Sequence, residues 1–359
     1  MSKSQLGQFY TTNYEYILQN CVVPSDTSCV VEPFVGNGDL LNFLGEDTSG
    51  LGPGLGPGLR LEVEKYDIDP KTEDTIKRDT LLEPPDYNGK FVLTNPPYLA
   101  RNKSQNKEIY DKYNTNDLYK CFIISIINSK CVGGIMIIPL NFISSIRKAD
   151  VDLRRSFLEL FRIDVLNIFE EQVFDDTSYA VCTIQFTRIT ESPGEQSPIN
   201  TYIYPSGNHY IFKLTADNNY TIGGEIYNLT SSSGIKVERA THINEKSEFL
   251  TNILLKCIDD NINSQLGFKL VADEERYIDK TDKLSARSYA TLIIHRKLTL
   301  SQQDKLVKKM NSFIKTKREE YNSLFLTNYR ESNSIARKRI SFDLSFKICG
   351  YMVDTIIDD

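Results

Sequence analysis

Hydrophobic positions in the first half of the chain alternate between short apolar runs and helical spacing. Six β-branched, apolar runs predict strands at residues 28–33, 61–67, 91–94, 134–138, 164–169 and 180–187. Between them, apolar residues spaced as on a helix face predict helices at 40–44, 118–129 and 151–160. Strands that alternate with helices indicate a parallel, doubly wound α/β sheet. Sheets of this kind bind ligands beyond the carboxyl ends of their strands.

The alternation stops near residue 190, where a polar segment rich in Pro and Ser begins. Beyond it the pattern predicts short strands at 201–214 and 221–227 and helices at 244–262 and 301–326. We therefore expect a second domain of mixed α+β type that begins between residues 190 and 230, and we divide the chain into 1–215 and 216–359. A Gly-Pro-Gly-Leu repeat at 49–59 is interpreted as an exposed insertion without catalytic importance.

Composition narrows the class of protein. The 359 residues are 40% hydrophobic and 25% charged, and no apolar run is long enough to cross a bilayer. The first residues lack a secretory signal, so we expect a cytoplasmic protein. Seven scattered cysteines without a C-x-x-C pair, and three isolated histidines, argue against a disulfide framework and against a metal site.

Charge is distributed unevenly along the chain. The net charge is −6, but residues 285–347 carry 14 Lys and Arg against 5 Asp and Glu, with Tyr and Phe interleaved. A polyanion could bind such a segment. The simpler alternative is that its lysines form the solvated face of an ordinary helix. The candidate contacts to such a polyanion in the second half of the chain are Arg287, Arg296, Lys297, Arg330, Arg337, Lys338 and Arg339.

The first chemical signal is a glycine-rich turn that follows the first predicted strand. Gly36 and Gly38 allow a backbone to approach a ligand closely, although one G-x-G fits many nucleotide cofactors or a mere tight turn. The second strand ends at Asp67, whose carboxylate could accept from ribose hydroxyls while Ile68 covers a purine face. Asp79 could accept from an adenine amino group. Any of these acids could instead cap a turn.

The most specific motif is Asn-Pro-Pro-Tyr at residues 95–98, directly after a predicted buried strand. Two prolines stiffen the loop and direct its carbonyls outward. An exocyclic amino group on a base is a poor nucleophile, so a site that alkylates it should supply two hydrogen-bond acceptors. The Asn95 side-chain oxygen and the Pro96 carbonyl can do so, with Tyr98 stacked on the ring. The alternative is a rigid Asn-Pro turn without chemistry.

With these motifs in order, residues 7–187 resemble the amino-group DNA methyltransferases that use S-adenosylmethionine, in the gamma motif order of TaqI-like enzymes of restriction-modification systems. Residues 7–12 resemble the motif for the methionine end of the cofactor, 32–38 the main cofactor motif and 95–98 the catalytic motif. Asp117, Leu118, Tyr119 and Phe122 match a helix motif of adenine-specific members. The resemblance implies a Rossmann-like doubly wound methyltransferase sheet followed by a target-recognition domain.

The resemblance also implies roles for individual residues. The cofactor carboxylate would meet Thr11, the methionine part Glu32 and Gly36, the ribose Asp67, and the adenine Ile68 and Asp79. Tyr10, Phe34 and Gly38 belong to the same cofactor motifs. Asn95, Pro96, Tyr98 and Phe174 would form the catalytic site, with Phe174 against an extruded base.

The implied reaction is methyl transfer to adenine N6 of a base flipped out of double-stranded DNA. Cytosine N4 remains an alternative, because both amino groups present two hydrogens, and a protein glutamine amide is a more distant one. We expect a monomer in a prokaryotic cell or a virus-infected host, with any restriction endonuclease as a separate partner and no membrane association. The interpretation least consistent with these motifs is a binding module that retains the fold without catalysis.

Overall fold

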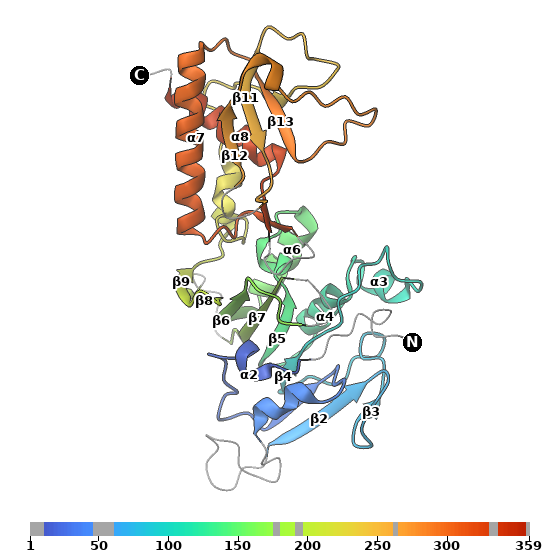
Figure 1. Ribbon diagram of the computed structural model, residues 1–359. Helices are drawn as coiled ribbons and strands as arrows, with labels where there is room; N and C mark the ends of the chain where they lie inside the picture. Colours follow the sequence, from blue (N-terminus) through green and yellow to red (C-terminus); the bar gives the residue numbers. More distant parts are fainter. Residues whose placement is uncertain are drawn as a thin grey trace. The chain divides into compact units, whose positions relative to one another are not determined.

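The computed structural model describes residues 11–45, 61–174, 180–190, 197–260, 265–329 and 337–356. The chain divides into two compact units (Figure 1). The first holds the described residues of Met1–Phe142 and Arg147–Lys213. The second holds those of Ile143–Ile146, Leu214–Glu331 and Ala336–Asp359.

A nine-stranded sheet forms the centre of the first unit, in the order β3-β2-β1-β4-β5-β7-β6-β8-β9. Its strands are β1 (Cys29–Glu32), β2 (Glu62–Asp67), β3 (Ile76–Lys77), β4 (Phe91–Thr94), β5 (Gly133–Pro139), β6 (Phe161–Phe169), β7 (Val181–Arg188), β8 (Ile199–Tyr204) and β9 (Asn208–Phe212). All six strands expected in the first half of the chain are present. The α/β class predicted from the alternation is thereby confirmed.

The five strands from β3 to β5 run parallel, and β1, β4 and β5 are buried along their whole length. Continuous apolar runs are typical of parallel strands covered on both faces. The expectation of an all-parallel sheet is wrong at β7, which pairs antiparallel with both β5 and β6. The described residues between β6 and β7 contain no helix, and antiparallel neighbours need no helical crossover.

The helices described in the first unit have between 4 and 11 residues. They comprise α2 (Tyr14–Ile17), the 3-10 helix η1 (Asp39–Leu44), α3 (Glu108–Tyr113), α4 (Leu118–Ile127) and α6 (Lys148–Leu158), while α5 (Asn141–Ser144) falls at the division between the units. Eight of the ten residues of α4 are buried, so this helix is apolar nearly all round. The segment predicted as a helix at 40–44 forms the 3-10 helix η1 instead.

The second unit contains a four-stranded antiparallel sheet in the order β10-β13-β11-β12. Its elements are the 3-10 turns η2 (Ala216–Asn218), η3 (Gly224–Asn228) and η4 (Asp273–Glu275), the strands β10 (Val237–Arg239), β11 (Leu250–Lys256), β12 (Gly267–Leu270) and β13 (Tyr289–Ile294), the helices α7 (Leu300–Glu320) and α8 (Phe342–Thr355), and a small pair, β14 (Thr327–Tyr329) with β15 (Arg337–Arg339). None of the helices described in the chain is both long and apolar enough to span a membrane.

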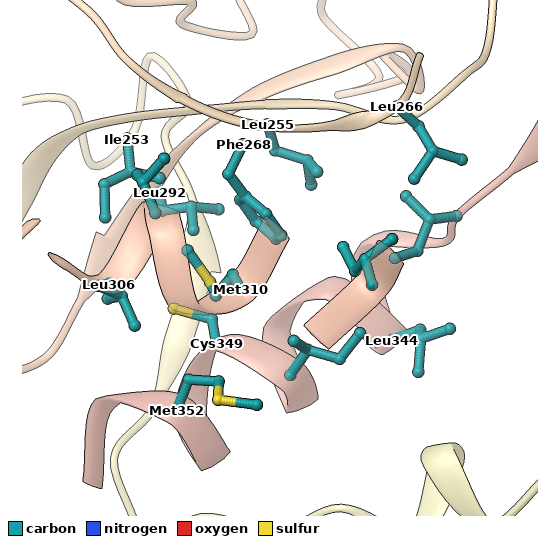
Figure 2. Close-up of a cluster of buried hydrophobic side chains, with 14 of the residues drawn as sticks. Ile253, Leu255, Leu266, Phe268, Leu292, Leu306, Met310, Leu344, Cys349 and Met352 are labelled. Carbon is teal, nitrogen blue, oxygen red and sulfur yellow. The ribbon is translucent and has the colours of Figure 1, made fainter. Parts of the chain in front are cut away.

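The core of the second unit lies between this sheet and its two long helices (Figure 2). Leu255 and Phe268 project from the sheet, and Met310 and Cys349 approach from α7 and α8. Each of these side chains is almost completely buried. At about 25 cal/mol per Å² of apolar surface removed from water, such burial is the main stabilising term of the unit.

Three expectations for the second half of the chain are corrected. Residues 221–227 were expected as a strand, but a 3-10 turn, η3, occupies most of them. Residues 244–262 were expected as a helix, but they contain strand β11, whose pairing with β12 and β13 overrides the helical spacing. The helix expected at 301–326 ends at Glu320. Strand β13 and helix α8 were not predicted.

Candidate functional site

A cavity of about 430 Å³ opens at the carboxyl ends of β1, β2 and β4 in the first unit. Glu32 is the last residue of β1, Asp67 is the last of β2 and Asn95 follows the last of β4; all three line the cavity. Parallel strands end at the same edge of a sheet, which brings residues far apart in sequence together here. The volume lies within the ordinary range of small-molecule sites, about 300–1,000 Å³.

The glycine-rich turn joins β1 to η1 and forms one wall of the cavity. Gly36 has φ +56° and its N–H donates to Asp67 Oδ2 at 2.8 Å. Gly38 has φ +84° and immediately precedes η1, but it does not line the cavity. A Cβ at Gly38 would be 3.9 Å from its nearest protein neighbour, Val35 Cγ1, so space within the protein does not require glycine there. Glycine is needed there for its left-handed backbone.

Glu32 is only 1% exposed, and one of its carboxylate oxygens is fully engaged. Oε1 accepts from the Phe34 N–H at 3.0 Å and from the Thr94 hydroxyl at 2.7 Å. Oε2 is buried without a hydrogen-bond partner among the described residues. Burial raises the pKa of Glu32 to about 8. The cavity wall therefore carries an acceptor oxygen that the described residues do not satisfy.

Asp67, rather than Asp69, is the acid on the cavity. It is 2% exposed, and Oδ1 accepts from the Asp69 N–H at 2.8 Å. Asp69 is exposed and pairs with Lys71 at 2.5 Å, a contact that lowers the pKa of Asp69. Ile68, which also lines the cavity, leaves 37% of its surface exposed, as a side chain that covers a flat ligand would.

Asp79 lies on the same cavity and caps a turn as well. Its Oδ1 accepts from the backbone N–H groups of Leu81 and Leu82, each at 3.1 Å. Asp67 and Asp79 thus cap turns, as the alternative interpretation of the sequence holds, and both also line the cavity. Thr80, next to Asp79, is buried and donates its hydroxyl to the Pro33 carbonyl at 2.9 Å, which ties this loop to the start of the glycine-rich turn.

The Asn-Pro-Pro-Tyr turn presents Asn95 and Pro97 to the cavity. Asn95 Nδ2 donates to Thr11 Oγ1 at 3.1 Å, which links the turn to the buried start of the described chain. Asn95 Oδ1 accepts from the Tyr98 hydroxyl at 2.6 Å. The Asn95 amide is therefore held on both sides in a single orientation. Pro96 is buried and does not line the cavity.

Tyr98 lies beneath the cavity wall rather than on it. Its side chain is 3% exposed, and its hydroxyl oxygen also lies 2.7 Å from the Ile137 carbonyl, so the single hydroxyl proton is shared between this carbonyl and Asn95 Oδ1. The ring packs edge-on against Tyr119, with centroids 6.4 Å apart. Burial raises the pKa of Tyr98 well above its usual value. The sequence predicted that the Tyr98 ring stacks on a base, but in this structure the ring is buried and does not line the cavity.

Phe174 is also buried, at 4% exposure, and does not line the cavity. Its carbonyl accepts from Gln172 Nε2 at 2.8 Å. The rest of that motif, residues 175–179, lies outside the described residues, as does Tyr10. Among the expected cofactor residues that the structure describes, Thr11, Glu32, Phe34, Gly36, Asp67, Ile68 and Asp79 line the cavity.

The helix motif at 117–122 contributes to the cavity and packs against its wall. Leu118 lines it, and Phe122 packs edge-on against Phe34, with ring centroids 5.4 Å apart. Asp117 precedes α4 and has a buried Oδ1 without a partner in the described chain. Burial raises the pKa of Asp117 to about 6.

Sequence reasoning missed the loop after the Asn-Pro-Pro-Tyr turn, which supplies much of the cavity lining. The residues concerned are Leu99, Lys103, Ser104, Gln105, Asn106, Ile109 and Tyr110. The Lys107 ammonium donates to the carbonyls of Arg101 and Ser104, and the Tyr110 hydroxyl donates to the Leu99 carbonyl at 2.9 Å. Nothing in the pattern of this polar loop indicated a binding role. Asp39, directly after the second glycine, was missed as well.

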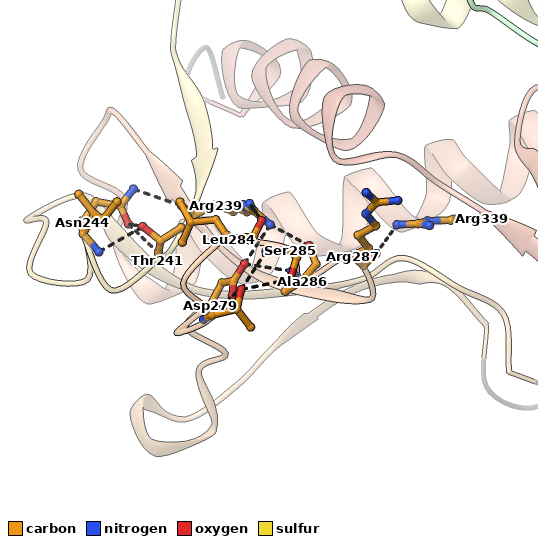
Figure 3. Close-up of polar contacts among 11 residues, drawn as sticks. Arg239, Thr241, Asn244, Asp279, Leu284, Ser285, Ala286, Arg287 and Arg339 are labelled. Atoms are coloured by element: carbon orange, nitrogen blue, oxygen red, sulfur yellow. Dashed lines mark hydrogen bonds and ion pairs between the residues drawn. The ribbon is translucent and has the colours of Figure 1, made fainter. Parts of the chain in front are cut away.

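In the second unit the candidate DNA contacts fall into different environments. Arg287 is exposed, and its carbonyl accepts from the Arg339 guanidinium at 2.8 Å, so two arginines 52 positions apart lie together (Figure 3). Lys297 is exposed but pairs with Glu248 at 2.8 Å. Lys338 is 6% exposed, so the expectation of a surface cation there is wrong. Arg296 is half-buried, and the side chains of Arg330 and Arg337 lie outside the described residues.

A polar network fixes the loop that carries Arg287. Asp279 is 1% exposed, and its carboxylate contacts the Arg239 guanidinium at 3.2 Å and accepts from the Thr281 hydroxyl at 2.7 Å and the Ala286 N–H at 3.1 Å (Figure 3). Arg239 also donates to the Ala286 carbonyl at 2.8 Å. This buried ion pair holds the loop against the end of β10.

The lysines of α7 fit the simpler of the two sequence interpretations. Lys308 pairs with Asp304 at 2.6 Å, and Lys317 pairs with Glu320 at 2.7 Å, both within the same helix. Among the described residues, no group of three or more His, Cys, Asp or Glu side chains could hold a metal ion.

Comparison with known proteins gives one family match. Residues 60–174, about a third of the chain, match the family described as Eco57I restriction-modification methylase. The matched segment includes the acid at the end of β2 and the Asn-Pro-Pro-Tyr turn. No curated protein matches the chain.

Several solved structures are similar to part of the chain at low identity. A modification subunit of a putative type I restriction enzyme from Vibrio vulnificus is 16% identical over 56% of this chain and 48% of its own, with a TM-score of 0.43. A type I methyltransferase subunit from Streptococcus thermophilus is 16% identical over 58% and 51%, with a TM-score of 0.40. A putative class I S-adenosylmethionine-dependent methyltransferase from Listeria monocytogenes is 12% identical over 52% and 61%, with a TM-score of 0.37. The chain spans about half the length of the first two.

Proposed function

We propose that this chain is a DNA methyltransferase that transfers a methyl group from S-adenosylmethionine to adenine N6 of a base flipped out of duplex DNA. The observation that carries the proposal is that Asn95, Glu32 and Asp67 line the same cavity. An acceptor amide for the target amino group thus lies beside carboxylates suited to a nucleoside linked to an amino acid. The match of residues 60–174 to a restriction-modification methylase family supports the same class of enzyme.

The residues of the cavity fit S-adenosylmethionine. Glu32 Oε2 is a buried acceptor without a partner among the described residues, and Ile68 offers an exposed apolar face for a purine. Asp67 and Asp79 would accept from the ribose hydroxyls and the adenine amino group, respectively. Thr11, which holds the Asn95 amide at 3.1 Å, would meet the carboxylate end. When bound, the cofactor supplies an electrophilic methyl group on a sulfonium sulfur.

The protein's contribution is to hold the target nitrogen in line with that methyl group. Asn95 Oδ1 and the Pro96 carbonyl accept the two amino hydrogens, which lets the nitrogen become tetrahedral as it gains positive charge. Extruding the base costs a few kcal/mol, and stacking on Tyr98 and Phe174 offsets this cost. Both rings are buried in the described structure. On this proposal, an entering base draws Tyr98 away from its hydrogen bond with Asn95.

In this proposal the two domains have different roles. Residues 1–215 form the catalytic domain, and residues 216–359 form the target-recognition domain, with Arg287 and Arg339 as its first candidate DNA contacts. Arg296 and Lys297 are further candidates. The protein acts as a monomer, and any restriction endonuclease paired with it is a separate chain.

Incubation with duplex DNA and labelled S-adenosylmethionine, followed by nucleoside analysis, tests the proposal. We expect the label in N6-methyldeoxyadenosine. Label in N4-methyldeoxycytidine would move the proposal to the cytosine class. Label in protein glutamine with none in DNA would replace it, and cofactor binding without transfer to any of these substrates would leave only a binding module.

A further inference from the structure

Two buried carboxylate oxygens on the cavity wall have no partner among the described residues. They are Glu32 Oε2 and Asp39 Oδ2. Among the buried side-chain polar atoms of the described chain that lack a partner, these are the two whose residues line the cavity. A buried carboxylate oxygen that makes no hydrogen bond is costly, so native proteins rarely keep one without a ligand or water to satisfy it.

The two oxygens lie at opposite ends of the glycine-rich turn. Glu32 is the last residue of β1 and Asp39 the first of η1, and the positive φ angles of Gly36 and Gly38 reverse the chain between them. Glu32 is held in place through its other oxygen by Phe34 and Thr94. The turn therefore contributes two unsatisfied acceptors to the wall of the cavity.

Three of the other charged side chains of the lining make hydrogen bonds within the protein, and the fourth, Lys103, is a cation. Asp67 accepts from the backbone N–H groups of Gly36 and Asp69, and Asp79 accepts from two further N–H groups. Arg78 donates to the carbonyls of Glu83 at 2.8 Å and Pro84 at 3.3 Å. Glu32 and Asp39 are therefore the acids of the lining with an unsatisfied oxygen, and they suit a ligand group that is cationic and carries several N–H donors. A primary ammonium group has both properties.

We propose that Glu32 and Asp39 together bind the α-ammonium group at the amino-acid end of S-adenosylmethionine, which makes Asp39 a specificity-determining residue for the cofactor. The inference rests on the proposed function, because it assumes that this cofactor occupies the cavity. It adds a residue to which neither the motifs nor the family match assigns a role.

Three ligands separate the contribution of the ammonium group from other effects. S-adenosylmethionine has both the ammonium and the sulfonium, S-adenosylhomocysteine keeps the ammonium but has a neutral sulfur, and 5′-methylthioadenosine lacks the amino-acid end. Titration calorimetry with each ligand would be run on the wild type and on Asp39→Ala and Asp39→Asn. Asp69→Ala is the matched control, because Asp69 is an acid of the same segment of the fold that pairs with Lys71 and does not line the cavity.

We expect Asp39→Ala to weaken binding of both amino-acid ligands by on the order of tenfold, the effect typical of a lost charged hydrogen bond. Binding of 5′-methylthioadenosine should not change, and Asp69→Ala should bind all three ligands as the wild type does. Asp39→Asn should lose affinity in the same direction, since it removes the charge but keeps the shape.

An equal loss for all three ligands would overturn the inference, because Asp39 would then serve only the shape of the turn. A loss confined to S-adenosylmethionine would also overturn it, because the sulfonium would be the group recognised. Unchanged affinity of Asp39→Ala for all three ligands would likewise overturn the inference, while leaving the proposed function intact. A wild type that binds none of the ligands would remove the proposed function itself.

Discussion

At the scale of single residues, the hydrogen bond between Tyr98 and Asn95 has a direct consequence for catalysis. The Tyr98 hydroxyl donates to the oxygen that, on our proposal, accepts from the target amino group. Tyr98→Ala removes both the donor and the stacking ring, whereas Tyr98→Phe removes only the donor. We expect methyl transfer to fall on the order of tenfold more in Tyr98→Ala than in Tyr98→Phe, a loss typical of one base–aromatic stack. Cofactor affinity should not change in either variant, because Tyr98 does not line the cavity.

Single-turnover transfer rates and cofactor titrations of both variants would check this expectation. Equal rates for the two variants would show that the Tyr98 ring does not stack on the substrate.

Glu32 predicts a pH dependence of stability. Burial raises its pKa from 4.5 to about 8, so between these values the folded state holds a proton that the unfolded chain has lost. The contribution of Glu32 to stability is thus fully present below about pH 4.5 and is lost as the pH rises through about 8. Between pH 5 and 8, the free energy of unfolding of the wild type should fall relative to Glu32→Gln by at most about 1.4 kcal/mol per pH unit.

Denaturant unfolding of both proteins at several pH values, without cofactor, measures this difference. Parallel pH profiles would mean that Glu32 is ionised in the folded protein at neutral pH.

The sequence indicated three of the four acids that line the cavity, Glu32, Asp67 and Asp79, but not how they are engaged. Glu32, Asp67 and Asn95 could be predicted because each follows or ends an apolar strand, and parallel strands end at one edge. The burial of Tyr98 and Lys338 could not be predicted, because it depends on packing against segments distant in sequence. Asp39 was missed because an acid after a glycine turn usually caps a helix.

At the scale of elements, strand β5 depends on two adjacent glycines. It lies between β4 and β7, and a Cβ on Gly134 would be 2.4 Å from the Val92 carbonyl oxygen and 3.0 Å from the Phe186 ring. Gly134→Ala should therefore lower the free energy of unfolding by about 1–3 kcal/mol, as expected for overpacking. Gly350→Ala in α8 is the control, because its new Cβ would meet only ordinary contacts at 3.5 Å or more.

A helical alanine in place of glycine gains up to about 1 kcal/mol, so the Gly350 variant should be neutral or more stable. Chemical denaturation gives both values, and a Gly134→Ala protein as stable as the wild type would contradict the close packing of β4, β5 and β7.

The first unit was easier to predict than the second for a physical reason. Buried parallel strands such as β4 and β5 are continuous apolar runs whose length alone distinguishes them from helices. Strand β11 has apolar residues at spacings that also fit a helix, and only its long-range pairing with β12 and β13 decides between the two. Helix α7 was predictable because Thr299 and Gln302 form a capping box that marks its start.

At the scale of the whole molecule, the proposal needs a surface that binds phosphates. Arg287 and Arg339 lie together on the second unit and are available for this role. Changing both to Gln should weaken binding to duplex DNA and reduce the slope of log affinity against log salt by up to about 2. Lys308→Gln, on the solvated face of α7 and paired with Asp304, should leave both quantities unchanged.

Fluorescence anisotropy at several salt concentrations provides the test. If the double variant keeps the affinity and slope of the wild type, the duplex contacts another surface.

The central claim is that the Asn95 amide activates an amino group for methyl transfer, and one variant tests it most directly. Asn95→Ala should reduce the single-turnover rate of methyl transfer to duplex DNA by on the order of 10²-fold or more, while the dissociation constant for S-adenosylmethionine stays within about threefold of the wild type. Asn88→Ala, in an exposed turn away from the cavity, should retain the wild-type rate. Near-normal transfer by Asn95→Ala would contradict the account.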